Sequence, residues 1–180
     1  MSQLTPDVRD SDHIDGPADA PVTLVQYGDY ECPHCGAAYP ILKTLKQRFG
    51  DRLRFVFRNF PLAESHPHAE HAAEAAEAVA DLGGSAAFWA MHDSLYEHQS
   101  AMEDEDLVRY ASDVGVDGAS VRRALENHTY RSRVREDFKS GVLSGVNGTP
   151  TFFINGTRFD GYWPDVEQFA AALQAEAVAR

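Results

Sequence analysis

The chain has 180 residues, and its hydrophobic share of 43% and charged share of 24% are typical of a globular protein. That length suffices for one domain, or for one domain that carries an insertion. The formal net charge of −12 disfavours nucleic acid and anionic membranes as partners. No stretch approaches the roughly 18 consecutive apolar residues of a membrane-spanning helix, so we expect no membrane span.

The first residues bear on the cellular compartment. Residues 1–7 have no basic start, no apolar core and no small-residue cleavage site, so they do not form a secretory signal. With Met1 as the natural start, we expect a cytoplasmic location, where disulfides are usually transient and catalytic. A natural chain that extends before Met1 would leave a periplasmic or other extracytoplasmic location open.

The first third of the chain predicts a strand–helix–strand unit. Residues 1–20 are polar and rich in Asp, Pro and Gly, which indicates a loop or arm. The apolar run 22–27 predicts a strand at the centre of a sheet. Helical spacing follows from Cys35 until Gly50 ends the helix. Residues 52–58 alternate polar and apolar, so they predict a second strand of a right-handed βαβ unit.

The middle of the chain is helical. Its acidic run at 103–106 fits the first turn of a helix, where it complements the helix dipole, better than it fits a metal site. We expect four to five helices, over 66–81, 88–96, 103–114, 121–125 and 130–138.

The last segment restores the sheet. Two β-rich runs, 151–154 and 157–159, are separated by Asn155-Gly156, which is a strong signal for a hairpin. An alanine-rich segment that ends at Arg180 predicts a closing helix. The whole pattern predicts an α/β fold with an all-helical insertion.

The only two cysteines, Cys32 and Cys35, lie directly between the first strand and the first helix. Cys32 then falls at the helix N-cap or just before it, Pro33 at the first helical position, and Cys35 inside the first turn. Unpaired N–H groups and the positive end of the helix dipole stabilise a thiolate at this place. Cys32 is therefore the candidate nucleophile, and Cys35 is the candidate resolving thiol.

The neighbours of the cysteines are candidates for tuning them. A charged imidazole at His34 would lower the thiol pKa and stabilise the reduced pair, which makes the disulfide a stronger oxidant. Pro33 and His34 are therefore the candidate tuning residues. Asp29 and Glu31 could relay a proton to Cys35 or raise the thiol pKa as like charges, but we expect them to be solvated loop acids.

A C-x-x-C pair can also be half of a zinc site. Structural zinc takes about four ligands, and the cysteine pair would need His66, His68 or His71 to complete a set. The strand before and the helix after the motif favour redox chemistry instead. A permanent disulfide across two residues would restrain the unfolded chain little. We expect no metal and no cofactor, because the cysteines are themselves the redox group. A zinc-binding or chaperone-like module stays as the alternative.

Two segments, 27–35 and 148–156, are similar to the DsbA-like branch of the thioredoxin superfamily, and the likeness extends over most of the chain. The Cys-Pro-His-Cys run resembles that of bacterial periplasmic disulfide oxidases. Residues 16–23 look more like related thioredoxin domains, including those fused to sodium/proton antiporters. The resemblance implies a thioredoxin-like fold with a first part at 1–61, a helical insertion at 62–144 and a second part at 145–180.

The resemblance implies a thiol–disulfide oxidoreductase that acts on protein thiols or disulfides through a mixed disulfide on Cys32. It also implies that Pro150 is cis and that Thr149 and Pro150 offer backbone hydrogen bonds to an extended substrate. A redox partner protein or a small thiol would complete the cycle, and a reductase dependent on low-molecular-weight thiols is a second alternative. The family's classical oxidases are exported, so the direction of electron flow stays open for this chain.

Overall fold

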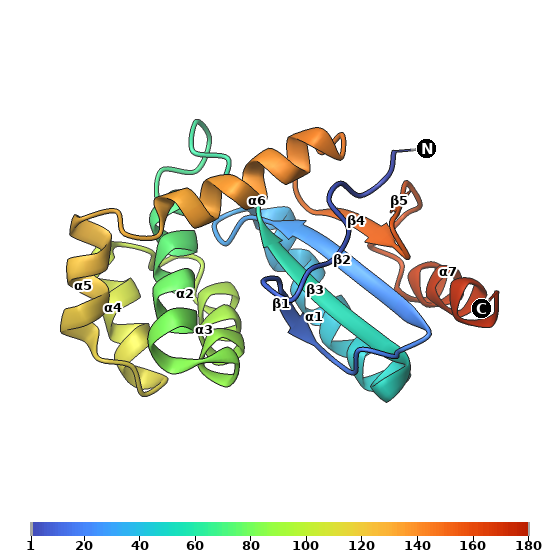
Figure 1. The fold of residues 1–180 in the computed structure, drawn as a ribbon, viewed down its shortest axis with the longest axis horizontal. Helices are drawn as coiled ribbons and strands as arrows, with labels where there is room; N and C mark the ends of the chain where they lie inside the picture. Colours follow the sequence, from blue (N-terminus) through green and yellow to red (C-terminus); the bar gives the residue numbers. More distant parts are fainter. Residues whose placement is uncertain (1, 180) are drawn as a thin grey trace. The chain divides into compact units, whose positions relative to one another are not determined.

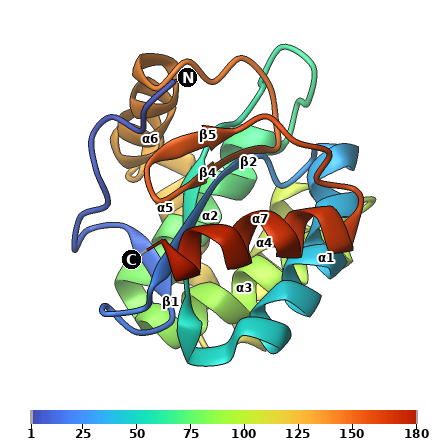
Figure 2. The same ribbon diagram turned by 90° about the vertical axis from the view of Figure 1, so that its right-hand side faces the viewer.

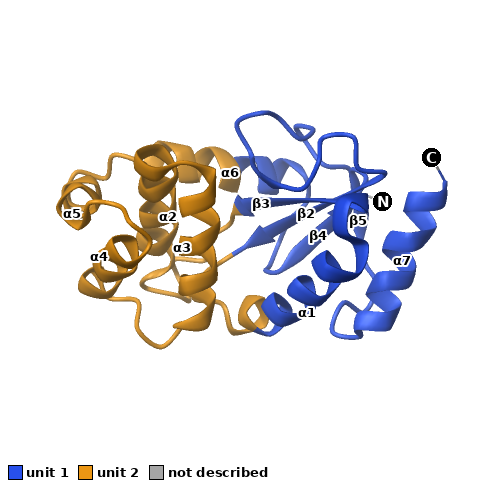
Figure 3. Cartoon of the chain, turned by 90° about the horizontal axis from the view of Figure 1, so that it is seen from below, with its two compact units in different colours: residues 1–28, 37–58, 139–180 blue, residues 29–36, 59–138 orange. Residues whose placement is uncertain are grey.

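We describe residues 2–179 in a computed structural model of the protein. The chain divides into two compact units, which Figure 3 shows in different colours. Unit 1 comprises residues 1–28, 37–58 and 139–180, and unit 2 comprises residues 29–36 and 59–138. The domain boundaries expected after residues 61 and 144 stay a prediction.

Unit 1 is built on a five-stranded mixed sheet with the strand order β1-β3-β2-β4-β5. The arrows of β2 and β3 point the same way in Figure 1, whereas β1 with β3, β2 with β4, and β4 with β5 are antiparallel. In the register of β2 with β4, Tyr27 is opposite Thr151 and Leu24 is opposite Ile154. The strands are β1 (His13–Asp15), β2 (Val22–Gly28), β3 (Leu53–Asn59), β4 (Thr151–Ile154) and β5 (Thr157–Phe159).

Helix α1 (Pro33–Phe49) connects β2 to β3, followed by a short 3-10 turn at Gly50–Arg52, so the predicted strand–helix–strand unit is confirmed. Helix α7 (Val166–Val178) closes the chain and lies in front of the sheet in Figure 2. It packs on the hairpin through Phe169, whose ring centroid is 5.0 Å from that of Phe152 and 4.9 Å from that of Phe159. The predicted hairpin and closing helix are therefore confirmed.

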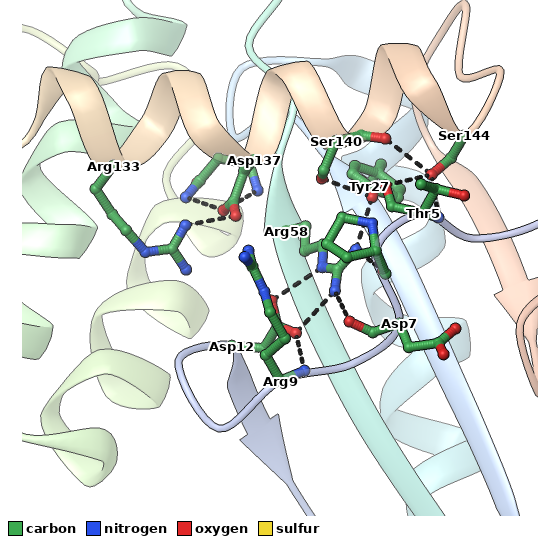
Figure 4. Close-up of polar contacts among 12 residues, drawn as sticks. Thr5, Asp7, Arg9, Asp12, Tyr27, Arg58, Arg133, Asp137, Ser140 and Ser144 are labelled. Atoms are coloured by element: carbon green, nitrogen blue, oxygen red, sulfur yellow. Dashed lines mark hydrogen bonds and ion pairs between the residues drawn. The ribbon is translucent and has the colours of Figure 1, made fainter.

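The N-terminal arm differs from the expected loop, because His13–Asp15 form β1 and pair with β3. The reason lies in a neighbouring ion pair. Arg58 on β3 is fully buried, and its guanidinium donates to both carboxylate oxygens of Asp12, at 2.9 and 2.8 Å (Figure 4). It also donates to the Tyr27 hydroxyl at 2.9 Å and to the carbonyl of Asp7 at 3.0 Å. These contacts hold the arm against the edge of the sheet.

Unit 2 is helical, as predicted. Its central helix α2 packs against three others, and its buried face is largely alanine, which lets the helices approach closely. Glu103 and Asp106 form a capping box at the start of α4, so the acidic run is confirmed as a helix first turn. The helices are α2 (Ala69–Gly83), α3 (Ser85–Glu97), α4 (Asp104–Asp113), α5 (Gly118–Glu126) and the first turns of α6 (Arg131–Leu143), which continues into unit 1.

The helices described for residues 2–179 were compared with the length and hydropathy that a membrane-spanning helix needs. None of them is both long and apolar enough to cross a membrane.

Candidate active site

The cysteine pair opens helix α1 in unit 2. The helix begins at Pro33, so Cys32 directly precedes it and Cys35 lies in its first turn, as the sequence predicts. The structure describes both cysteines as thiols, with Cys32 3% exposed and Cys35 0% exposed. Pro33 and His34 are exposed between them. The N–H of Gly36 donates to the Cys32 carbonyl at 3.0 Å, so the helical hydrogen bonds begin at the first cysteine.

Asp29 organises the loop that leads to Cys32. Its Oδ1 atom accepts the N–H groups of Glu31 at 2.8 Å and of Cys32 at 3.1 Å. Its Oδ2 atom accepts the N–H of Leu62 at 2.8 Å and lies 2.7 Å from Nδ1 of His66. Asp29 is only 1% exposed, so the expectation of a solvated loop acid was wrong for this residue. Its carboxylate fixes the backbone of the loop that places Cys32 directly before the helix.

His66 is the side-chain partner of this buried carboxylate, and its Nδ1 lies 2.7 Å from Oδ2 of Asp29. Burial alone would lower the pKa of His66, but the hydrogen bond and charge of Asp29, with the charges of Cys32 and Glu31, outweigh it and raise the pKa. The electrostatic coupling with Cys32 is reciprocal. A protonated His66 therefore favours a thiolate at Cys32. The sequence marked His66 only as a zinc candidate, because nothing local shows that it reaches a carboxylate 37 residues earlier in the chain.

Gln99 supports the same loop from the segment after α3. Its Nε2 atom donates to the carbonyl oxygens of Tyr30 and Cys32, both at 2.9 Å. A Cβ atom on Gly36 would lie 2.1 Å from Oε1 of Gln99. Glycine at position 36 therefore leaves the room that this side chain needs, and no sequence motif reveals that requirement.

An aromatic layer lies behind the cysteines in unit 2. The Tyr30 hydroxyl is 3.0 Å from Nδ1 of His92, and the rings of Tyr30 and Tyr96 are 5.0 Å apart. Burial raises the pKa of both tyrosines well above the usual range, and the charge of Cys35 adds to the effect at Tyr96. Both phenols therefore stay neutral. The layer is a medium of low polarity, in which the interactions of nearby charges are stronger than in water.

The alternative zinc set does not come together around the cysteines. Among residues 2–179, the side chains whose ligand atoms converge as a metal site are those of His71, Glu74 and His128. That group contains neither cysteine. His66 is bound to Asp29, and Nε2 of His68 lies 3.5 Å from a carboxylate oxygen of Glu103.

The candidate substrate-binding residues lie in unit 1. Thr149 and Pro150 directly precede β4, and the peptide bond between them is cis. Their role in substrate binding stays a prediction.

Comparison with curated proteins finds relatives among sodium/proton antiporters. The chain is 44% identical over 170 residues to the Na(+)/H(+) antiporter NhaA 1 of Salinispora arenicola, an alignment that covers 94% of this chain and 25% of that protein. The antiporter NhaA of Herminiimonas arsenicoxydans is 41% identical over 164 residues. The chain spans about a quarter of the length of the curated relatives it matches.

Solved structures share the fold. BdbD from Bacillus subtilis, in its oxidised form, superposes with a TM-score of 0.85 at 24% identity, over 93% of each chain. MdbA from Corynebacterium diphtheriae, described as a thiol-disulfide oxidoreductase, superposes with a TM-score of 0.69 at 20% identity, over 86% of this chain and 85% of that one. The family model described as Thioredoxin matches residues 9–175. Since this match covers most of the chain, the protein belongs to the thioredoxin family.

Proposed function

We propose that the chain is a thiol–disulfide oxidoreductase that exchanges disulfides with protein substrates through a mixed disulfide on Cys32, which Cys35 resolves. Pro33 and His34 tune the pair, and Thr149 and Pro150 hold the substrate segment. The Thioredoxin family match and the superposed structures, among them MdbA, which is described as a thiol-disulfide oxidoreductase, support the assignment.

The observation that carries the proposal is the placement of Cys32 at the N-terminus of a 17-residue helix, with Cys35 in the first turn. A helix start stabilises negative charge through its unpaired N–H groups and its dipole. Burial lowers the pKa of His66, but the hydrogen bond and charge of Asp29, followed by the charge of Cys32, raise it overall. This coupling supports a second source of thiolate stabilisation. Cys35 is fully buried and one helical turn away, which suits a thiol that attacks only after the first exchange.

The chemistry in the reducing direction has two balanced steps. The Cys32 thiolate attacks one sulfur of a substrate disulfide, which forms the mixed disulfide and releases one substrate thiolate. The Cys35 thiolate then attacks the Cys32 sulfur, which forms the Cys32–Cys35 disulfide and releases the second substrate thiolate. Two electrons pass from the cysteine pair to the substrate, and the two protons lost by the pair end on the substrate thiols. The oxidising direction is the reverse.

The direction in the cell depends on the reduction potential and the compartment. In a reducing compartment such as the cytoplasm, the pair works as a reductase or isomerase. In that case a redox partner protein or a small thiol regenerates the dithiol. Equilibration with glutathione measures the potential and decides between the two directions.

Trapping of the mixed disulfide tests the proposal. In Cys35→Ser, the first step proceeds and the second cannot, so disulfide-linked adducts with a reporter protein such as insulin should accumulate on Cys32 and disappear with dithiothreitol. Cys32→Ser is the matched control and should form no adduct. Two results would contradict the assignment. One is that Cys32→Ser forms adducts on Cys35 as fast as Cys35→Ser forms them on Cys32, and the other is that the unaltered chain does not reduce insulin.

A further inference from the structure

A second cluster of chemically reactive side chains lies within unit 2 and is separate from the cysteine pair. His71 and Glu74 are three residues apart, so they share one face of α2. His128 follows α5, which packs against α2. One ligand atom from each of the three lies within 4.8 Å of the others.

The distances in the cluster match those between ligands of one metal ion. Nδ1 of His128 is 3.4 Å from Oε2 of Glu74, and Nε2 of His71 is 4.0 Å from the same oxygen. Two ligands that each lie about 2.1 Å from a tetrahedral zinc ion are about 3.4 Å apart. The first pair already has this spacing, and a small side-chain rotation of the half-buried His71 provides the second.

Glu74 supplies an independent sign that the cluster has a ligand. The residue is 1% exposed, and its Oε1 atom has no hydrogen-bond partner among residues 2–179. A carboxylate oxygen buried without a donor or a cation is destabilising. Oε2 faces the two histidines, so a metal ion bound by both oxygens of Glu74 would also satisfy Oε1.

His71 is held as metal-binding histidines are held. Its Nδ1 atom lies 2.7 Å from Oδ1 of Asp104. An ionised carboxylate only accepts hydrogen bonds, so Nδ1 carries a proton. Nε2, on the side of Glu74, is then the nitrogen whose lone pair the neutral imidazole offers to a metal ion. A carboxylate behind the imidazole is the usual arrangement around a metal-bound histidine, because it fixes the tautomer and makes the ligand more basic.

His128 has two neighbours that one protonation state cannot satisfy. Nη2 of Arg131 lies 2.8 Å from its Nδ1 and 3.0 Å from its Nε2, and Oε2 of Glu74 lies 3.4 Å from Nδ1. A proton on Nδ1 would face the N–H of Arg131, and a lone pair there would face the anionic oxygen of Glu74. A metal ion bound to Nδ1 and Glu74 removes this conflict. Arg131 then retains Glu70, whose carboxylate is 3.2 Å from its Nε.

We propose that His71, Glu74 and His128 bind one divalent transition-metal ion, with Zn²⁺ as the best match and water in the fourth position. Two imidazoles and one carboxylate are a ligand set that zinc favours. The ion would tie α2 to the end of α5 and thereby stabilise unit 2. The thiols take no part, so the site is independent of the proposed disulfide exchange.

Zinc titration of the full chain tests the site, in a Cys32→Ser/Cys35→Ser background that removes thiolate ligands. Calorimetry should show one Zn²⁺ per chain, and Co²⁺ should give the intense visible absorption of a tetrahedral site. Asp104→Asn removes the carboxylate behind His71 and should weaken zinc binding about 10–100-fold. His71→Gln and His128→Gln each remove a ligand and should weaken zinc binding more than that, by at least about 100-fold. Arg131→Gln should bind as tightly or more tightly, because it removes a competing cation.

The exposed His98→Gln is the matched control and should bind as the parent does. Far-UV circular dichroism checks that each variant is folded, and Zn²⁺ should raise the melting temperature of the parent but not of His71→Gln or His128→Gln. No stoichiometric binding, or binding that survives both histidine substitutions, would overturn the proposal. Because the background lacks both thiols, neither result depends on the redox assignment.

Discussion

At the scale of single residues, the loop before α1 depends on the pair of Asp29 and His66. The hydrogen bond and charge of Asp29, with the charges of Cys32 and Glu31, more than offset the effect of burial and raise the pKa of His66. A histidine with a raised native pKa stabilises the fold fully below its unfolded pKa of about 6.5, and this contribution is lost as the pH rises through the native pKa.

We therefore expect His66→Gln to lower the free energy of unfolding most at about pH 5.5 and least at about pH 9, on either side of the ordinary histidine pKa. Urea unfolding across this pH range measures the difference. His98→Gln, at an exposed position, is the control. A His66→Gln effect that stays constant or grows toward alkaline pH would show that His66 is not the cationic partner of Asp29.

His34 tests the tuning of the pair. It is exposed at the second position of α1, between the two cysteines. Its imidazolium should favour the Cys32 thiolate, so His34→Ala should make the pair more reducing and shift the equilibrium with glutathione toward the disulfide. An equilibrium constant that does not change would make His34 a bystander.

The sequence predicts the cysteines and the helix start but not the residues around them. Cys32, Pro33 and Cys35 lie within four consecutive residues, so their relation to the helix follows from local rules. Asp29 looks like any loop acid, because its burial depends on donors at Leu62 and beyond. Contacts of that range are set by packing, which no local pattern encodes.

At the scale of elements, α7 packs on the rest of unit 1 through two fully buried side chains, Phe169 and Leu173, of which Phe169 is aromatic. Phe169 is fully buried, and its ring packs against Phe152 and Phe159 of the hairpin. Phe169→Ala should lower the free energy of unfolding by about 3–5 kcal/mol, because it removes the ring and leaves a cavity. Val178→Ala, in the same helix but 75% exposed, should change it by less than about 0.5 kcal/mol. Similar urea midpoints for both variants would contradict this packing.

The periodicity of the sequence predicts the long helices and strands. It does not predict strand β1, which the sequence analysis took for a loop. Helices such as α2 and strands such as β3 carry strong patterns over 15 and seven residues. Strand β1 has only three residues and forms because Asp12 and Arg58 hold it beside β3. A three-residue strand has too few positions to show alternation.

At the scale of the whole molecule, a buried ion pair anchors the N-terminal arm of unit 1. Burial would lower the pKa of Arg58, but its hydrogen bonds with Asp12 and Tyr27 raise it, so the guanidinium stays charged. Arg58→Met should cost about 3–5 kcal/mol of stability, because it leaves a buried carboxylate without its cation. Arg58→Met/Asp12→Leu should recover part of that loss in urea unfolding. A double variant no more stable than the single one would exclude this account of the anchor.

The central claim is that the start of α1 makes Cys32 a reactive thiolate. The rate of alkylation of Cys32 by iodoacetamide against pH, measured in Cys35→Ser so that only one thiol reacts, tests it most directly. The rate should rise with a midpoint clearly below the ordinary cysteine pKa of about 8.5, because the helix start stabilises the thiolate and His66 adds to this where it is protonated. A midpoint at or above about 8.5 would contradict the claim.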